Sequence, residues 1–287
     1  MSGIVWLASF PKSGNTWTRI FLTNYQRNSE VPADINDLEP TPISAARVKI
    51  EDALGIDLAD LTADEIDVLR PAAYRRMAAA AVETQFMKVH DGYYANMRGE
   101  PLLSGARAVV YIVRNPLDVC VSWAKHSGIT LESSVEFLCS PAANVGSSDR
   151  AIAEQLRQHV GGWTGHVRSW TEQRDMPVHV MRYEDMLRDP HAAFGDMLRF
   201  VGVDVETERL NRAVRHSSFD ELKKQEKEKG FREAMKQGES GFFGSGRSGG
   251  WRTKLSAEHA EALVRAHADT MRAFGYESDC SGFEHFQ

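Results

Sequence analysis

Residues 11–17, Pro-Lys-Ser-Gly-Asn-Thr-Trp, combine the side chains that a loop for an anionic ligand needs. Lys12 adds a positive charge, Ser13 and Thr16 add hydroxyl donors, and Gly14 lets the backbone approach a ligand closely. If this loop joins a strand to a helix, the first N–H groups of that helix also point at the bound anion. The segment therefore predicts an anion site. The alternative is an ordinary turn with one exposed lysine.

The order of residues in this loop differs from that of a nucleotide kinase. A Walker-type loop places Lys directly after the second Gly of a Gly-x4-Gly pattern, and Ser or Thr follows it. Here Lys12 precedes Gly14, and no strand ending in Asp is evident as a source of a magnesium ligand. A kinase is therefore the weaker alternative, and no metal site is expected.

A second pair of anion-binding side chains, Arg114 and Ser122, follows the apolar run 107–113. That run predicts a buried strand, and Asn115-Pro116 predicts the start of a helix, with Asn as its cap. Ligands of open parallel sheets bind at the carboxyl ends of the strands, where Arg114 would lie, and its planar guanidinium matches a phosphate. The alternative is a salt bridge from Arg114 to Asp118.

His90 ends another predicted strand, residues 85–90, so it would face the same edge of the sheet. An imidazole with a pKa near 6.5 can take a proton from a hydroxyl group at neutral pH. Because the chain has ten histidines, a surface or packing role is the alternative reading of this position. The other histidines receive no role.

All these residues fall at junctions between alternating strands and helices. Such alternation predicts a single α/β domain over residues 1–287, with a central parallel sheet flanked by helices. Within it, residues 30–83 are expected to form an acidic helical insertion, because eleven acids lie between positions 30 and 70. Strands are expected over 4–10, 85–90, 107–113 and 178–183, and helices over 15–25, 51–83 with a break at Pro71, 150–174, 191–202, 204–215 and 256–273.

The composition bounds the class of protein. The 287 residues carry 34 Lys+Arg against 40 Asp+Glu, a net charge of −6, and are 42% hydrophobic, so neither disorder nor nucleic-acid binding is expected. The three cysteines, Cys120, Cys139 and Cys280, are too few and scattered for a disulfide framework. No export signal and no run of ~20 apolar residues is evident, so a cytoplasmic protein without a membrane partner is expected.

Together, the two anion-binding segments resemble motifs of the sulfotransferases that use 3′-phosphoadenosine 5′-phosphosulfate (PAPS). Residues 11–17 resemble the family's phosphosulfate loop, usually PKSGTTW, with Asn15 in place of one Thr. Arg114 and Ser122 resemble its 3′-phosphate motif, an Arg followed eight residues later by a Ser. Residues 182–186 (RYEDM) and 217–223 (SSFDELK) resemble two further nucleotide-binding segments. The resemblance covers residues 4 to about 255.

The resemblance implies a P-loop-kinase-like sulfotransferase fold and transfer of a sulfuryl group from PAPS to an acceptor hydroxyl, without a metal. It implies that His90, in a segment similar to the family's KTHLP motif, is the general base, and that Lys12 stabilises charge on the leaving phosphate. The cofactor-binding residues that it implies are Lys12, Ser13, Gly14, Asn15, Thr16, Trp17, Arg114, Ser122, Tyr183, Ser217, Phe219, Gly246 and Arg247.

The late motif of the family, Arg-Lys-Gly-x-x-Gly-Asp-Trp-Lys, is matched only in part. When it is aligned on Trp251, Gly246 and Gly249 agree, but the Arg-Lys pair is missing and Arg247 comes three places later. Either Arg247 reaches the 3′-phosphate by another path, or that phosphate is held less tightly. Residues 240–252 are expected to be a Gly-rich loop that covers the cofactor, and a plain linker is the alternative.

The acceptor site is the least readable part of the sequence. Phe10, Phe86, Tyr93 and Tyr94 are candidates to line it, and aromatic walls would suit a phenolic or lipophilic alcohol. The expected partner is thus a small-molecule hydroxyl acceptor. A non-catalytic nucleotide-binding protein derived from a sulfotransferase is the rival to an enzyme, and the oligomeric state is left open, with a homodimer as one alternative.

Overall fold

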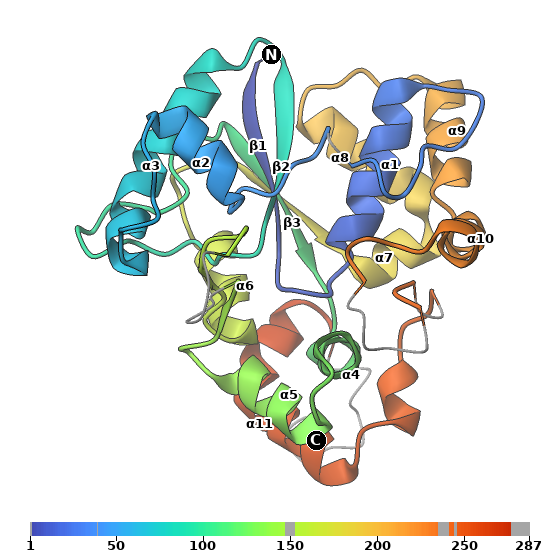
Figure 1. Ribbon diagram of the computed structural model, residues 1–287. Helices are drawn as coiled ribbons and strands as arrows, with labels where there is room; N and C mark the ends of the chain where they lie inside the picture. The colour runs from blue at the N-terminus through green and yellow to red at the C-terminus, as the bar shows by residue number, and fades with distance from the viewer. Residues whose placement is uncertain (1, 39, 147–152, 235–240, 244–245, 277–287) are drawn as a thin grey trace.

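The computed structural model describes residues 2–38, 40–146, 153–234, 241–243 and 246–276. Their centre is a sheet of four strands in the order β2-β1-β3-β6, and every neighbouring pair is parallel (Figure 1). The predicted α/β fold with a central parallel sheet is therefore confirmed. The strands are β1 (Gly3–Ser9), β2 (Thr84–Val89), β3 (Ala108–Val113) and β6 (Val178–Arg182).

Alternation along the strands divides the core into two layers. Trp6 and Tyr111 belong to the apolar cluster on one face, whereas Leu7 and Ile112 belong to the cluster on the other. All four are fully buried, because a parallel sheet with crossover helices is covered on both sides. This two-sided burial explains why these strands are continuous apolar runs in the sequence.

The helices form three groups around the sheet (Figure 1). None of the described helices is long and apolar enough to cross a membrane. One face packs against α2 (Arg47–Leu54), α3 (Ala63–Ala80), α6 (Trp163–Thr171) and α11 (Ala257–Ala273), and the other against α1 (Asn15–Arg27), α7 (Tyr183–Arg188), α8 (Pro190–Phe200) and α9 (Thr207–His216). The remaining elements are α4 (Pro116–Ser127), α5 (Leu131–Cys139), α10 (Phe219–Lys229), the short β4 (Asn144–Val145) and β5 (Gln158–His159), and the 3₁₀ turn η1 (Gly250–Thr253).

The acidic segment 30–83 is a layer of the core as well as a charged surface. Its apolar side, from Ile50 to Tyr74, is buried in the cluster that covers β1. The expected break at Pro71 is wrong, because α3 runs through it. Pro71 has no N–H for the carbonyl of Asp67, but the side-chain amide of Asn96 donates to that carbonyl instead, at 3.3 Å.

The long helix expected over 150–174 is also wrong in extent. Residues 150–152 lie outside the described residues; within 153–174 only α6, from Trp163, is helical, and residues 158–159 form the short strand β5. Two glycines with positive φ, Gly161 and Gly162, precede the helix. A Cβ on Gly162 would lie 3.0 Å from the carbonyl oxygen of Ser140, so the close approach of these two segments requires glycine there.

A buried ion pair anchors the chain directly after β2. Arg70 of α3 and Asp91 are both fully buried, and their charged atoms lie 2.6 Å apart. Arg70 also donates to Asp67 and to the carbonyl of Arg157. The Asp91 carboxylate accepts the backbone N–H of His159 at 3.0 Å. Asp91, the residue next to His90, is therefore held in place by α3 through an ion pair that is buried away from water.

We expect Arg70→Met to lower the free energy of unfolding by about 3–5 kcal/mol, because Asp91 would keep a buried charge without its partner. The matched control is Arg75→Met on the same helix, whose partner Glu100 shares an ion pair that is open to solvent. That variant should lose less than about 1 kcal/mol. Urea denaturation measures both, and equal losses would contradict the anchoring role of Arg70.

Candidate active site

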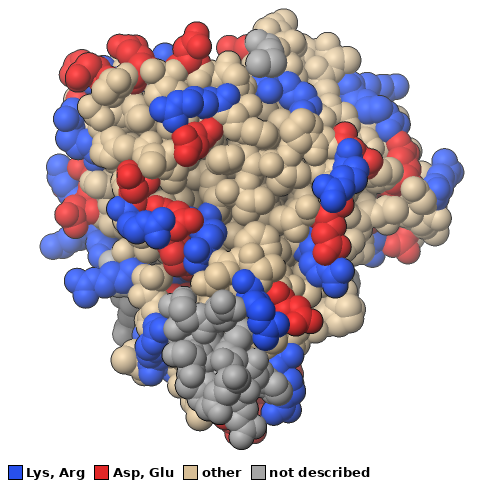
Figure 2. Space-filling model, turned by 180° about the vertical axis from the view of Figure 1, so that it is seen from behind, with Lys and Arg blue, Asp and Glu red and all other residues tan. Residues whose placement is uncertain are grey.

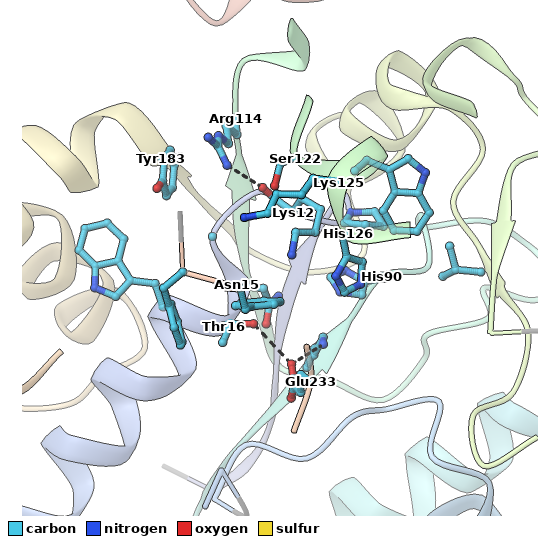
Figure 3. A pocket seen from close by; sticks show the side chains of 18 of the residues that line it. Lys12, Asn15, Thr16, His90, Arg114, Ser122, Lys125, His126, Tyr183 and Glu233 are labelled. Carbon is cyan, nitrogen blue, oxygen red and sulfur yellow. Dashed lines mark hydrogen bonds and ion pairs between the residues drawn. The ribbon is translucent and has the colours of Figure 1, made fainter. Parts of the chain in front are cut away.

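A cavity of about 800 Å³ opens at the carboxyl edge of the sheet. The loops that follow β1, β2 and β3 meet there, and Figure 3 shows Lys12, His90 and Arg114 converging on it. Ligands of open parallel sheets bind at this edge. Twelve of the residues expected to form the site line the cavity: Lys12, Gly14, Asn15, Thr16, Trp17, His90, Arg114, Ser122, Tyr183, Phe219, Gly246 and Arg247.

The loop after β1 has the backbone of an anion-binding turn. Lys12 has a φ of 69° and Gly14 one of 114°, so the backbone reverses direction twice before α1 begins at Asn15. A Cβ on Gly14 would lie 2.8 Å from the ring of Tyr183, so no larger residue fits there. The first-turn N–H groups of α1 have no partners within the helix and remain available to an anion.

Two polar side chains of this loop, those of Asn15 and Ser13, are turned toward the protein interior. The amide of Asn15 donates to the carbonyl of Leu7 at 2.7 Å and to the hydroxyl of Ser9 at 3.3 Å, which ties the start of α1 to the end of β1. Ser13 is fully buried and does not line the cavity, and its hydroxyl has no partner among the described residues. Asn15 therefore holds the loop in shape from below, and its backbone N–H remains for a ligand.

Lys12 carries the most perturbed charge in the loop. Burial is the main cause that lowers its pKa, with Lys88 and Arg114 adding repulsion, and the result is about 7. Its ammonium lies 3.7 Å from the centre of the Phe242 ring. A cation held among other cations gains stability when an anion binds beside it. The loop is thus electrostatically prepared for a phosphate or sulfate group.

Arg114 lies at the end of β3, as expected, and its surroundings fix its direction. Its guanidinium stacks over the Tyr183 ring at 4.3 Å and donates to the carbonyl of Lys12 at 3.0 Å (Figure 3). The alternative salt bridge to Asp118 is not formed. Asp118 instead accepts the backbone N–H groups of Gly249 and Trp251, at 2.6 and 3.1 Å. Arg114 is therefore free to face an anionic ligand with Ser122.

An aromatic shelf lies beside the loop. The Trp17 indole donates to the carbonyl of Ser217 at 2.8 Å, and its ring lies 4.9 Å from Phe219 and 6.0 Å from Tyr183. The Ser217 hydroxyl bonds the carbonyl of Ala213 within α9 and does not line the cavity, so Ser217 contributes its backbone to the shelf. Flat apolar rings of this kind suit a purine base.

His90 has one ring nitrogen committed and one available. Its Nδ1 lies 2.8 Å from the carbonyl of Ser9, and because a carbonyl only accepts, Nδ1 must carry the proton. The neutral ring therefore has its lone pair on Nε2. Burial, and then the charge of Lys88, lower the pKa of His90 well below its usual value, so the ring is neutral at physiological pH. Neutral His90 can act as a base through Nε2.

Neighbouring side chains hold the backbone that carries this imidazole. The fully buried His166 donates from Nε2 to the backbone carbonyl of His90 at 3.2 Å, and its Nδ1 accepts from the hydroxyl of Tyr111 at 2.9 Å. Burial lowers the pKa of His166 to about 3, so it stays neutral and holds this arrangement. The carbonyl of the next residue, Asp91, accepts from the Trp170 indole at 3.0 Å. Two hydrogen bonds thus fix the backbone at His90 and Asp91.

Several residues that line the cavity were not predicted from the sequence to belong to the site. Lys88, Lys125, His126 and Glu233 all line the cavity, and the Glu233 carboxylate lies 3.3 Å from the ammonium of Lys88. Lys88 had a weak signal, two positions before His90 on a strand whose side chains alternate. Glu233 had none, because it follows a run of charged residues that reads as a solvated surface.

Residues 241–243 and 246–251 contribute to the cavity wall and are held on both sides, which a plain linker would not be. Glu226 of α10 accepts the N–H groups of Phe242 and Phe243. On the α4 side, Asp118 accepts from Gly249 and Trp251, and Lys125 donates to the carbonyl of Gly241 at 2.7 Å. Residues 240, 244 and 245 of the expected loop lie outside the described residues. We call residues 241–243 with 246–251 the strap.

The four aromatic residues expected at the acceptor site lie elsewhere, and none lines the cavity. Phe10 is buried against Phe137 and His166, and Phe86 belongs to the core beneath α1 and α8. The Tyr93 hydroxyl donates to Asp175 at 2.6 Å, and Tyr94 lines a separate cavity of about 200 Å³. Burial explains the placement of Phe10 and Phe86, since large apolar rings beside strand ends pack into the core.

Possible metal ligands and the distribution of charge bear on what the cavity can bind. Among residues 2–38, 40–146, 153–234, 241–243 and 246–276, no group of three or more His, Cys, Asp or Glu is arranged to hold a metal ion. Figure 2 shows the face opposite to that of Figure 1, where side chains of both charges alternate around a broad uncharged area. Among the described residues, seven cations line the cavity or its rim: Lys12, Lys88, Arg114, Lys125, Arg232, Arg247 and Lys254.

The chain is similar in sequence to characterised proteins. Luciferin sulfotransferase of Photinus pyralis is 25% identical over 228 residues, which cover 76% of this chain and 56% of that protein. The chain thus spans little more than half the length of this relative. Sulfotransferase 2A2 of Rattus norvegicus is 24% identical over 278 residues, 93% of this chain and 84% of that protein.

Solved structures share the fold. A mouse sulfotransferase, SULT7A1, crystallised with PAP, superposes with a TM-score of 0.56 at 19% identity, covering 94% of this chain and 85% of that one. Retinol dehydratase in complex with androsterone and PAP gives 0.58 at 18% identity, covering 93% and 80%. The model of the sulfotransferase domain matches residues 3–275, from the first strand of the sheet to the last helix. Because that match takes in the anion loop, the cavity and the strap together, the chain belongs to the sulfotransferase domain family.

Proposed function

We propose that this protein transfers a sulfuryl group from PAPS to the hydroxyl of a small molecule, with His90 as the general base. The observation that carries the proposal is the convergence on one cavity of an anion loop, a guanidinium beside an aromatic shelf, and an imidazole with a free Nε2. The family match and the PAP named in the titles of two structural neighbours support it.

The donor site is assigned from the charges and the shape of the cavity. The 5′-phosphate and the sulfate would bind Lys12 and the N–H groups at the start of α1. The 3′-phosphate would bind Arg114 and Ser122, while Trp17 and Phe219 would flank the adenine. The Arg114 Nε, a buried polar atom of the cavity lining without a partner among the described residues, fits an anionic ligand. Gly246 fits closely over this shelf, since a Cβ there would lie 2.7 Å from Phe219.

The chemistry needs a base on one side of the sulfur and a cation on the other. His90 Nε2 takes the proton of the acceptor hydroxyl as the acceptor oxygen forms its bond to sulfur. The bond from sulfur to the phosphate oxygen breaks, and its electron pair leaves with PAP, where Lys12 offsets the new charge. Positioning and electrostatic stabilisation supply the rate, as in phosphoryl transfer.

The acceptor end of the cavity has a mixed wall. It includes Ile43, Val145, Gln155 and Glu154, and the aromatic ring of Trp123 also lines the cavity. A hydroxyl acceptor that has both an apolar or aromatic part and some polar groups suits this mixed wall. The rival function, nucleotide binding without catalysis, gains support only from the missing Arg-Lys pair of the late motif.

The test of the function is incubation with PAPS and a panel of aliphatic alcohols, phenols, polyols and amines, followed by mass spectrometry. We expect a product that is heavier by one sulfuryl group, formed equally well in the presence of EDTA. Binding of PAPS without transfer to any member of the panel would favour the non-catalytic rival. Transfer that stops in EDTA would contradict a metal-free mechanism.

Replacing His90 by Ala should lower turnover by about 10²–10⁴, the range for a positioned general base. The affinity for PAP should stay within about threefold, because His90 lies beyond the phosphates. His126→Ala is the control, since it removes another histidine of the same cavity. A larger loss in His126→Ala than in His90→Ala would show that the base is misassigned.

Arg114→Ala should weaken PAP by about 10- to 100-fold, the value of a hydrogen bond to a charged group. Adenosine 5′-phosphate, which has no 3′-phosphate, serves as the matched ligand. Calorimetry of both ligands on both proteins isolates the contribution of the 3′-phosphate from any disturbance of the Lys12 carbonyl. An equal loss for the two ligands would remove Arg114 from the 3′-phosphate site.

A further inference from the structure

Glu233 brings a carboxylate to the base of the cavity from the segment between α10 and the strap (Figure 3). Its Oε1 accepts from the Arg19 guanidinium at 2.6 Å. Its Oε2 accepts from the Lys88 ammonium at 3.3 Å and lies 3.5 Å from the Thr16 hydroxyl of the anion loop. A negative group therefore lies within the part of the cavity that is otherwise prepared for anions.

The two oxygens of this carboxylate have different tasks. Arg19 is 3% exposed and is itself held by Thr41, whose carbonyl and hydroxyl both accept from Arg19 Nε at 3.1 Å. Oε1 is thus fixed to α1 by a buried, doubly anchored cation. Oε2 is left to face the cavity, where it meets Lys88 and Thr16. Arg19 therefore holds the carboxylate so that Oε2 has a fixed position in the cavity.

Charge explains why a carboxylate is tolerated there. Burial disfavours the charged form of a lysine, and repulsion between neighbouring cations disfavours it further. Both effects therefore lower the pKa of the lysines in this part of the cavity. Burial lowers the pKa of both Lys12 and Lys88, and Glu233 opposes this at each. Lys88 and Arg19 in turn hold the pKa of Glu233 down, at about 2, against the effect of its burial. Glu233 is therefore ionised, and its charge keeps protons on its neighbours.

We propose that Glu233 is a positioning residue for the sulfuryl transfer: its Oε2 holds the Lys88 ammonium beside Thr16, and its charge offsets the positive charge at the base of the cavity while His90 takes up a proton. The inference rests on the proposed function. It assigns a role to a residue outside every sequence motif discussed above, on a segment that has no regular secondary structure.

The groups that face this carboxylate define what its removal changes. Thr16, Arg19 and Lys88 contact it directly, and its charge also acts on Lys12, His90 and His126. Except for the hydroxyl of Thr16, all are cations or potential cations. Loss of the negative charge therefore lowers the pKa of Lys12, Lys88, His90 and His126, because Glu233 acts to raise the pKa of each of them.

The test is the affinity for PAP as a function of pH between about 6 and 10, measured by calorimetry on the full chain. The affinity of the wild type should fall as pH rises through about 7, because Lys12 then loses its proton in the free protein. In Glu233→Gln the fall should begin about one pH unit lower, the lower end of what one neighbouring charge does.

Two variants separate the charge of Glu233 from a structural role. Glu226→Gln loosens the strap without removing the charge beside Lys88, so it should change the affinity and leave the pH of the fall in place. Glu233→Asp keeps the charge and should restore the wild-type curve in large part, and it also serves if Glu233→Gln does not fold. Imidazole NMR of the free proteins, assigned with His90→Ala, should show His90 titrating at a lower pH in Glu233→Gln.

The outcomes are distinct. Superimposable pH curves for the wild type and Glu233→Gln, or an equal shift in Glu226→Gln or Glu233→Asp, would overturn the role of Glu233. Absence of PAP binding by the wild type at every pH would instead overturn the proposed function. A shift confined to Glu233→Gln, together with the lower titration of His90, would support both.

Discussion

Positive charge gathered where water is scarce is the constraint on which the site depends. Lys12, Lys88 and Arg114 converge at the carboxyl edge of the sheet in a protein whose net charge is −6. Burying cations together is unfavourable unless anions balance them. The fold brings them together because three parallel strands end side by side: Lys88 lies near the end of β2, and Lys12 and Arg114 follow β1 and β3. An anionic ligand then finds a site that already attracts it.

Carboxylates organise the surroundings of this charge. Asp118 and Glu226 each accept two backbone N–H groups and so fix the two ends of the strap, while Glu233 meets the cations directly. On the other side of His90, the Arg70–Asp91 pair fixes the backbone that carries the base. The residues proposed for catalysis, Lys12 and His90, lie on short loops, and the chain after His90 is attached to α3 by a buried ion pair. This is how loops can hold reacting groups with the precision of a rigid scaffold.

The sequence predicts the parts of this structure that are local. Apolar runs ending at Pro11, His90 and Arg114 mark the strands, and the Asn-Pro cap marks α4, because each signal depends on neighbouring residues alone. The parallel sheet and the family are confirmed. Pro71 misleads because the compensating donor, Asn96, comes from a distant loop. The acceptor wall and Glu233 escape prediction for the same reason, since only tertiary packing decides which rings are buried and which carboxylate enters the cavity.

The hydrogen bond from His90 Nδ1 to the Ser9 carbonyl has a consequence for the whole catalytic cycle. It leaves Nε2 as the one nitrogen that can exchange a proton, and in the proposed reaction Nε2 faces the part of the cavity that holds the acceptor. After one transfer both ring nitrogens carry a proton, and the ring is positively charged. The proton on Nε2 can leave only through the part of the cavity where the sulfated product lies. In the proposed reaction, recovery of the base therefore waits for the departure of product and the arrival of water, so product exit and deprotonation form one event.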